Sequence, residues 1–130
     1  MGVKSMVVTD SILNTIKHML GVEPEYTHFD NDIINDINAA INVLSQIGAV
    51  KKDYAIEGPN ETFEDMMGDD LKKAMMVKTY IYHKVKLMFD PPLSSSVSGI
   101  IEKQIAELEW RLNVELDNPE EEPANVDDSE

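Results

Sequence analysis

The sequence predicts an all-α protein, a small helical bundle organised around a long antiparallel helix pair. Apolar residues recur at intervals of three and four along several segments, which is the spacing of one helix face. The two longest such segments lie at about residues 69–90 and 94–115, on either side of Asp90-Pro91-Pro92. Residues before a proline are disfavoured in helices, so the first segment must end there. The short connection that follows predicts that the two helices are antiparallel neighbours.

Two further helices are predicted before this pair. The first runs from about residue 12 to 20, because Ser11 can cap its first turn and Gly21 can end it. The second runs from about residue 30 to Gly48, and its isoleucines, alanines and leucine form one broad apolar face. The middle segment, residues 49–68, is predicted to be irregular, with a turn at Gly58-Pro59-Asn60 and a short helical stretch near residues 61–67.

The apolar face of the long pair predicts its core. On each helix we expect the residues with three-to-four spacing to point toward the partner helix. The candidate core residues are Leu71, Met75, Tyr82 and Val85 on the first helix, and Ile101, Ile105, Leu108, Trp110 and Leu112 on the second.

The length and charge distribution predict one domain with an acidic tail. A chain of 130 residues fits a single domain, which we assign to residues 1–116. The net charge is −14, and from Glu115 to the end the chain has eight acidic residues and no basic one. Residues 117–130 are therefore predicted to be a disordered acidic tail, because so polar a segment cannot form a core. Val3–Val8 is apolar and fits either an arm or an edge strand.

The sequence offers no constellation of residues for catalysis, cofactor binding or metal binding, so we expect a protein that is not an enzyme. Cysteine is absent, and His18, His28 and His83 share no ligand spacing. Asp30, Asp32 and Asp36 resemble the start of a calcium loop. That loop requires a glycine at its sixth position and a glutamate at its twelfth, where this chain has Asn35 and Ile41. Glycine-rich phosphate loops and nucleophile elbows are absent as well.

Five of the 11 basic residues lie on the first helix of the long pair and form the candidate subunit interface: Lys72, Lys73, Lys78, Lys84 and Lys86. They could form a solvated face, a contact with acidic residues of a neighbouring copy, or a stripe for DNA. The acidic net charge and the presence of a single arginine, Arg111, argue against DNA, so no specific nucleic-acid binding is expected. No apolar run approaches the roughly 18 residues of a membrane span, so no membrane partner is expected either.

The tract from Val77 to Glu115 resembles a known family. Its most specific parts are Lys78-Thr79-Tyr80-Ile81-Tyr82, Phe89-Asp90-Pro91-Pro92 and Glu107-Leu108-Glu109-Trp110-Arg111-Leu112. Together with the order of the preceding elements, they are similar to the small head-tail connector proteins, also called head completion or adaptor proteins, of long-tailed bacteriophages. The resemblance extends over about Ile12 to Leu116.

This resemblance implies an all-helical structural protein of the virion neck, assembled in the host cytoplasm. It implies that identical copies form a ring below the portal after DNA packaging and provide the docking surface for the next neck or tail component. The implied partners are other copies of the chain, the portal protein and a downstream neck or tail-completion protein. The alternative is an acidic helical adaptor or DNA mimic that binds a single host or phage partner.

Overall fold

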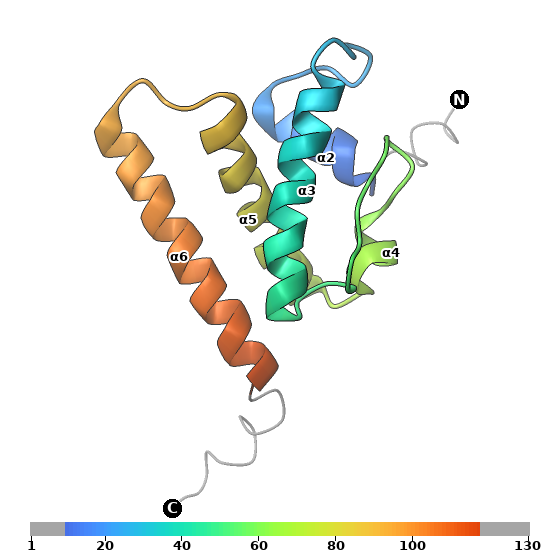
Figure 1. The fold of residues 1–130 in the computed structure, drawn as a ribbon, viewed down its shortest axis with the longest axis vertical. Coiled ribbons are helices and arrows are strands. Elements are labelled where there is room, and N and C mark those ends of the chain that lie inside the picture. The colour runs from blue at the N-terminus through green and yellow to red at the C-terminus, as the bar shows by residue number, and fades with distance from the viewer. Residues whose placement is uncertain (1–9, 118–130) are drawn as a thin grey trace, which may run out of the picture.

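The computed structural model describes residues 10–117, with side chains as far as residue 114. In this range the chain forms helices α2 (Ile12–Leu20), α3 (Asp30–Ile47), α4 (Phe63–Met67), α5 (Leu71–Phe89) and α6 (Ser95–Asp117), as Figure 1 shows. The predicted all-α fold is confirmed, and the β-type pairing described is a single bridge between Ser11 and Thr62. Val3–Val8, predicted to be an arm or an edge strand, lies outside the described residues, as does the predicted tail of residues 117–130 apart from Asp117, which ends α6.

The core lies between α2, α3 and α5, with α4 and its preceding loop closing one side. The most extensive helix contacts are those of α3 with α5 and of α5 with α6. In Figure 1, α3 lies in front of α5, α6 runs along one flank, and α4 lies on the opposite flank. As a result α6 covers the bundle from one side only, and it touches α3 at few positions.

Helix α3 forms the central wall of the core because its apolar residues are confined to one face. That face is fully buried and consists of Ile33, Ile37, Ala40, Ile41 and Leu44. The opposite face is rich in asparagine and aspartate, which favour helix weakly, so the helix depends on its burial.

The helix ends follow from their capping residues. The side chains of Ser11, Thr62 and Asp70 each accept a hydrogen bond from the backbone N–H three residues further on, at 3.0 to 3.1 Å. These bonds satisfy amides that have no partner inside the first turn. Gly21 and Gly48 end α2 and α3 with φ values of +85° and +95°, which glycine adopts without steric cost.

The predicted irregular segment is anchored to α3 by one asparagine. The Asn38 side chain donates to the Ile56 carbonyl oxygen at 3.0 Å and accepts from the Ile56 N–H at 2.8 Å. Ile56 is buried, so its polar backbone groups need these partners. This pairing holds a long connection without regular structure against the bundle.

The break at Asp90-Pro91-Pro92 lies where the sequence predicts it. Helix α5 ends at Phe89, and α6 begins at Ser95. Lys86 Nζ lies 2.9 Å from Asp90 Oδ2, which places a positive charge on the last turn of α5. The second helix of the pair continues to Asp117, two residues beyond its predicted end.

Candidate interaction surface

Part of the predicted core of the α5–α6 pair is buried. Val85 and Leu112 are fully buried, and Ile105 is nearly so. Tyr82, Ile101 and Leu108 are half-buried and pack against the core. These residues of α6 are separated by three or four positions, so they form one seam along the helix.

Three other candidate core residues are at the surface, which corrects the prediction. Leu71 is 77% exposed, Met75 is 68% exposed and Trp110 is 65% exposed. Trp110 lies off the seam of α6, two residues before Leu112, so the helix turns it away from α5. Leu71 and Met75 lie in the first turns of α5 and are left uncovered by the other described helices.

Of the residues that form the core face of α5, only Val85 belongs to the candidate core predicted from the sequence. Val77, Tyr80, Ile81 and Val85 are all fully buried. Val77, Ile81 and Val85 follow one another at intervals of four, and Tyr80 lies next to Ile81. Val77, Ile81 and Val85 are β-branched, which distinguishes them from Leu71 and Met75. The Tyr80 hydroxyl donates to Glu109 Oε2 at 2.6 Å and so joins α5 to α6. Burial and this carboxylate raise the pKa of Tyr80 well above its ordinary value of 10.0.

The five candidate interface lysines do not share one face of α5. At 3.6 residues per turn, Lys73 and Lys84 lie on one side and Lys72 and Lys86 on another, with Lys78 closer to the second group. Lys73, Lys78, Lys84 and Lys86 are all half-buried, whereas Lys72 is exposed. Their role at a subunit contact stays a prediction.

Lys78, Lys84 and Lys86 each make a contact within the chain. Lys78 Nζ lies 5.0 Å from the centre of the Phe63 ring, and Lys84 Nζ lies 5.9 Å from the Tyr80 ring. Lys86 pairs with Asp90. Cation–π contacts of this kind contribute about 0.5–1 kcal/mol at exposed sites. Any substitution at these lysines therefore also removes a contact inside the subunit.

The outer face of α5 carries a mixed apolar and basic row, which we call the α5 stripe. Its members lie at successive intervals of four, three, four and four, which places them along one line of the helix. They are Leu71, Met75, Lys78, Tyr82 and Lys86.

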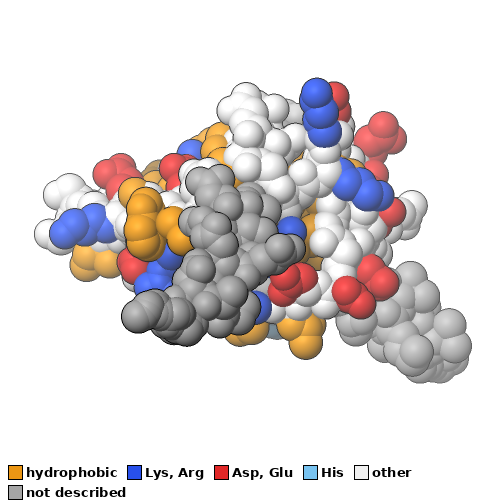
Figure 2. All heavy atoms as spheres, turned by 90° about the horizontal axis from the view of Figure 1, so that it is seen from below, with side chains coloured by type: hydrophobic (Ala, Val, Ile, Leu, Met, Phe, Trp, Pro, Cys, Tyr) orange, Lys and Arg blue, Asp and Glu red, His pale blue; other side chains and the backbone are white. Residues whose placement is uncertain are grey.

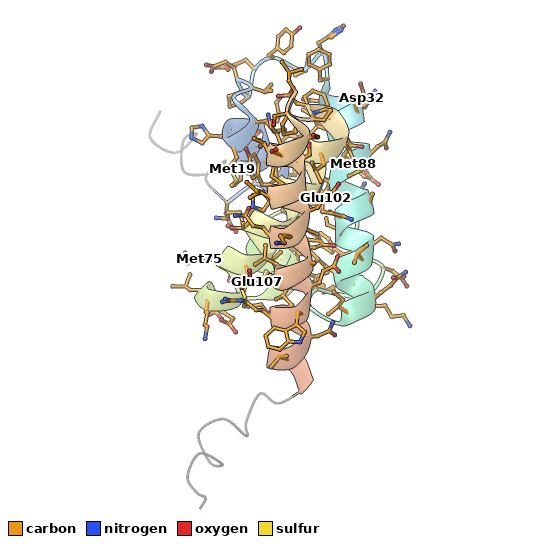
Figure 3. All side chains as sticks on the ribbon, turned by 90° about the vertical axis from the view of Figure 1, so that its left-hand side faces the viewer. Met19, Asp32, Met75, Met88, Glu102 and Glu107 are labelled. Carbon is orange, nitrogen blue, oxygen red and sulfur yellow. The ribbon has the colours of Figure 1, made fainter. Side chains whose placement is uncertain are left out.

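The outer face of α6 carries a second exposed apolar row. Ile100, Trp110 and Val114 are exposed. Trp110 and Val114 lie on the side opposite the buried seam, and Ile100 lies on its flank. Figure 3 shows α6 in front of the bundle, with its outer face toward the viewer. Figure 2 shows apolar side chains at separate places on the molecule's lower face, among charged side chains of both signs. The exposed apolar surface is therefore distributed over several sides.

An open pocket of about 450 Å³ lies between the start of α3 and the end of α5, and we call it the α3–α5 pocket. Burial, together with the neighbouring Asp32 carboxylate, raises the pKa of Asp36 above its ordinary value of 3.8. The pocket thus combines apolar walls with two carboxylates one helical turn apart. Its lining residues are Phe29, Asp32, Asn35, Asp36, Met88 and Phe89.

A buried lysine fixes the loop beside this pocket. Lys17 is fully buried, and its Nζ donates to the carbonyl oxygens of Pro24 and Tyr26, both at 2.9 Å. The same Nζ lies 2.7 Å from Asp30 Oδ1. The end of α2, the loop and the start of α3 are thereby held together. The sequence gives little indication that Lys17 holds the loop, because its pattern is that of an ordinary polar residue on a short helix.

Aromatic contacts extend from that loop to α5. Tyr26, His28 and Phe29 contact one another edge to face or tilted, at ring-centre distances of 4.8–6.0 Å. Phe29 also contacts Phe89 edge to face at 5.3 Å. One wall of the α3–α5 pocket is therefore rigidly positioned.

A smaller groove of about 250 Å³ lies between α5 and α6 and contains His83. His83 Nδ1 is buried and has no hydrogen-bond partner. Burial lowers the pKa of His83 below its ordinary value of 6.5. Glu107 and Arg111 of α6 line the same groove and pair with each other at 2.8 Å.

Among residues 10–117, no group of three or more histidine, cysteine, aspartate or glutamate residues could hold a metal ion. No helix in the described part of the chain is long and apolar enough to cross a membrane. The described surface does offer exposed apolar side chains, among them Met75, Met88 and Trp110, and methionine and aromatic residues are enriched at protein–protein contacts.

Residues 12–119 match the family model described as phage connector protein. The chain belongs to this family. The match includes all five described helices and the α5–α6 hairpin with its Asp90-Pro91-Pro92 break. Comparison with curated proteins and comparison with solved structures each give no match. The family is one of structural proteins, and it gives this chain a structural connector role in the phage neck.

Proposed function

We propose that identical copies of this chain form a ring below the portal and connect the DNA-filled head to the next neck or tail component. The observation that carries the proposal is the family match over residues 12–119. The match fixes the connector role, and the ring with its partners is our extension of it. The ring would assemble in the host cytoplasm and become part of the virion neck.

The surface of the subunit supports a ring over an isolated monomer. Large apolar side chains are exposed on α5, on α6 and near the pocket: Leu71, Met75, Met88, Ile100 and Trp110. A closed ring requires two different surfaces on each subunit, because each copy contacts its neighbours through unlike faces. Further exposed surface remains for contacts with the portal and the downstream protein. Tryptophan is enriched among the residues that dominate binding energy, which favours the α6 row as a contact surface.

Assembly in the presence of portal tests this function. Purified chain is mixed with portal particles of the same phage, and the complexes are examined by native mass measurement and negative-stain electron microscopy. We expect a ring of many copies stacked on one face of the portal. A chain that remains monomeric and never joins portal particles would show that the proposed function is wrong. Portal must be included, because a connector subunit can stay monomeric until it meets its platform.

A further inference from the structure

The first turns of the α5 stripe are left uncovered by the described part of the subunit. Leu71 and Met75 are among the most exposed large apolar side chains in the described chain, and Tyr82 continues the row half-buried. Lys78 and Lys86 lie within the stripe, and Lys72 flanks it on the first turn. Asp69 and Asp70 precede the stripe, and the Asp70 carboxylate caps the helix by accepting from the Lys73 N–H. The stripe itself is therefore apolar and positively charged.

The surface of opposite character lies at the α3–α5 pocket. Its apolar walls are Phe29, Met88 and Phe89, and its acidic rim is formed by Asp32 and Asp36. No lysine or arginine lines the pocket, and none occurs anywhere in α3. Desolvation already disfavours the charged form of Asp36, so a nearby cation would stabilise its carboxylate. The pocket accordingly fits an apolar side chain accompanied by a lysine.

The exposed apolar residues of the stripe lie in the first turns of α5, whereas the pocket lies at its last turn. In Figure 3, Met75 projects on one side of α6, while Asp32 and Met88 lie on the other side, next to α3. Leu71 and Met75 of one copy cannot reach its own pocket, because they lie roughly 20 Å or more before Met88 and Phe89 along the axis of α5. They can reach the pocket of a second copy placed alongside.

We propose that neighbouring copies associate head to tail, with the α5 stripe of one copy bound at the α3–α5 pocket of the next. This inference rests on the proposed ring and names the contact that would close it. The contact is heterologous, since it joins two unlike surfaces, and repetition of such a contact generates a ring. Leu71 and Met75 supply the apolar part of the contact, and Lys72 and Lys78 supply the charge that faces Asp32 and Asp36. A cationic stripe and an acidic pocket attract each other and at the same time disfavour stripe-to-stripe pairing.

A charge-swap experiment on full-length chain tests the contact. The first variant carries Asp32→Lys and Asp36→Lys, the second carries Lys72→Glu and Lys78→Glu, and the third carries all four substitutions. Each is mixed with portal particles, and the fraction of chain in rings is measured. At low salt, we expect the fraction of chain in rings to be at least tenfold lower for each double variant than for the unmodified chain. We expect the fourfold variant to recover most of it, because the opposed charges are again complementary.

Matched controls separate this contact from a general effect of charge. Glu57→Lys with Glu102→Lys adds the same charge as the first variant, at exposed positions outside both surfaces. Lys51→Glu with Lys52→Glu matches the second variant in the same way. Both controls should form rings as the unmodified chain does. Circular dichroism and thermal melting confirm that each variant is folded, and Asp32→Asn with Asp36→Asn provides a milder alternative if the lysine variant does not fold.

The outcomes distinguish this inference from the function on which it rests. If the unmodified chain forms no ring with portal, both the proposed function and this contact are wrong. If the unmodified chain forms rings and the folded double variants form them equally well, the ring stands and this contact is wrong. Loss of rings in the fourfold variant as well as in both double variants would also overturn the pairing of these two surfaces.

Discussion

Helices α3 and α5 are neighbours of nearly equal length, yet their apolar residues are distributed differently. The buried residues of α3 follow its single apolar face, from Ile33 to Leu44. Helix α5 has apolar residues on two sides, with Val77 and Ile81 facing the core and Leu71 and Met75 facing outward. A helix with one apolar face has only one way to pack, whereas a helix with two has one face left over. The second apolar face of α5 is the one that we propose for association between copies.

The largest expected effect is on the inner faces of the two helices. Ile37→Ala on α3 and Ile81→Ala on α5 each leave a cavity among fully buried neighbours. We expect each to lower the free energy of unfolding by about 2–5 kcal/mol, measured by urea denaturation. A loss below about 0.5 kcal/mol at Ile81 would mean that its face of α5 is not core.

A smaller effect is expected where α5 joins α6. Tyr80→Phe removes the hydroxyl that donates to Glu109 and leaves the buried ring in place. Hydrogen bonds to charged groups contribute about 1.5–3 kcal/mol, and we expect a loss at the lower end because Glu109 is half-buried. Glu109→Gln is the matched variant and should give a similar or smaller loss. Stability unchanged in Tyr80→Phe would show that this bond does not hold the pair together.

The smallest effect on folding is expected on the outer faces. Leu71→Ala, Met75→Ala and Trp110→Ala should each change the free energy of unfolding by less than about 0.5 kcal/mol, because the side chains are exposed. Thermal melting of the free chain checks this. A loss of 2 kcal/mol or more, as expected of a buried residue, would return these positions to the core.

The pH dependence of stability provides a test of direction. Because burial lowers the pKa of His83, the unfolded chain takes up a proton at a higher pH than the folded chain does. Neutral His83 therefore favours the folded state fully above its ordinary pKa of 6.5. This stability is lost as the pH falls toward the folded-state pKa of His83. Asp36 acts in the opposite direction nearer to pH 4, because its raised pKa favours protonation of the folded chain. When the pH is lowered from about 7 to 5, the urea midpoint of unfolding should therefore decrease less in His83→Gln than in the unmodified chain. An equal decrease in both chains would contradict this role of His83.

The sequence predicts the helices well because local signals determine them. Ser11, Gly21, Gly48 and the Asp90-Pro91-Pro92 break set the ends of elements through capping and backbone restrictions, and the structure has these ends within two residues. Such signals depend on neighbours in the chain. They carry over to the structure without knowledge of the tertiary packing.

The sequence predicts the faces of α5 poorly because packing determines them. Leu71 and Met75 have the same spacing and hydrophobicity as true core residues, so periodicity alone cannot separate the two faces. The contacts of the buried Lys17 also cannot be predicted from the sequence, since its three partners lie 7 to 13 residues away in a loop and the next helix. The pocket arises only when the start of α3 meets the end of α5. The interaction surfaces could therefore be identified only from the three-dimensional arrangement of the helices.

Methionine oxidation in the free chain and in portal-bound rings tests the central claim most directly. Met75 lies in the α5 stripe, Met88 lines the pocket, and Met66 is fully buried and serves as an internal reference. In the free chain, mass spectrometry after brief peroxide treatment should find Met75 and Met88 oxidised and Met66 protected. In the ring, Met75 and Met88 should both become protected, because each lies in the contact between copies. Oxidation of Met75 and Met88 at the same rate in rings and in free chain would contradict the account.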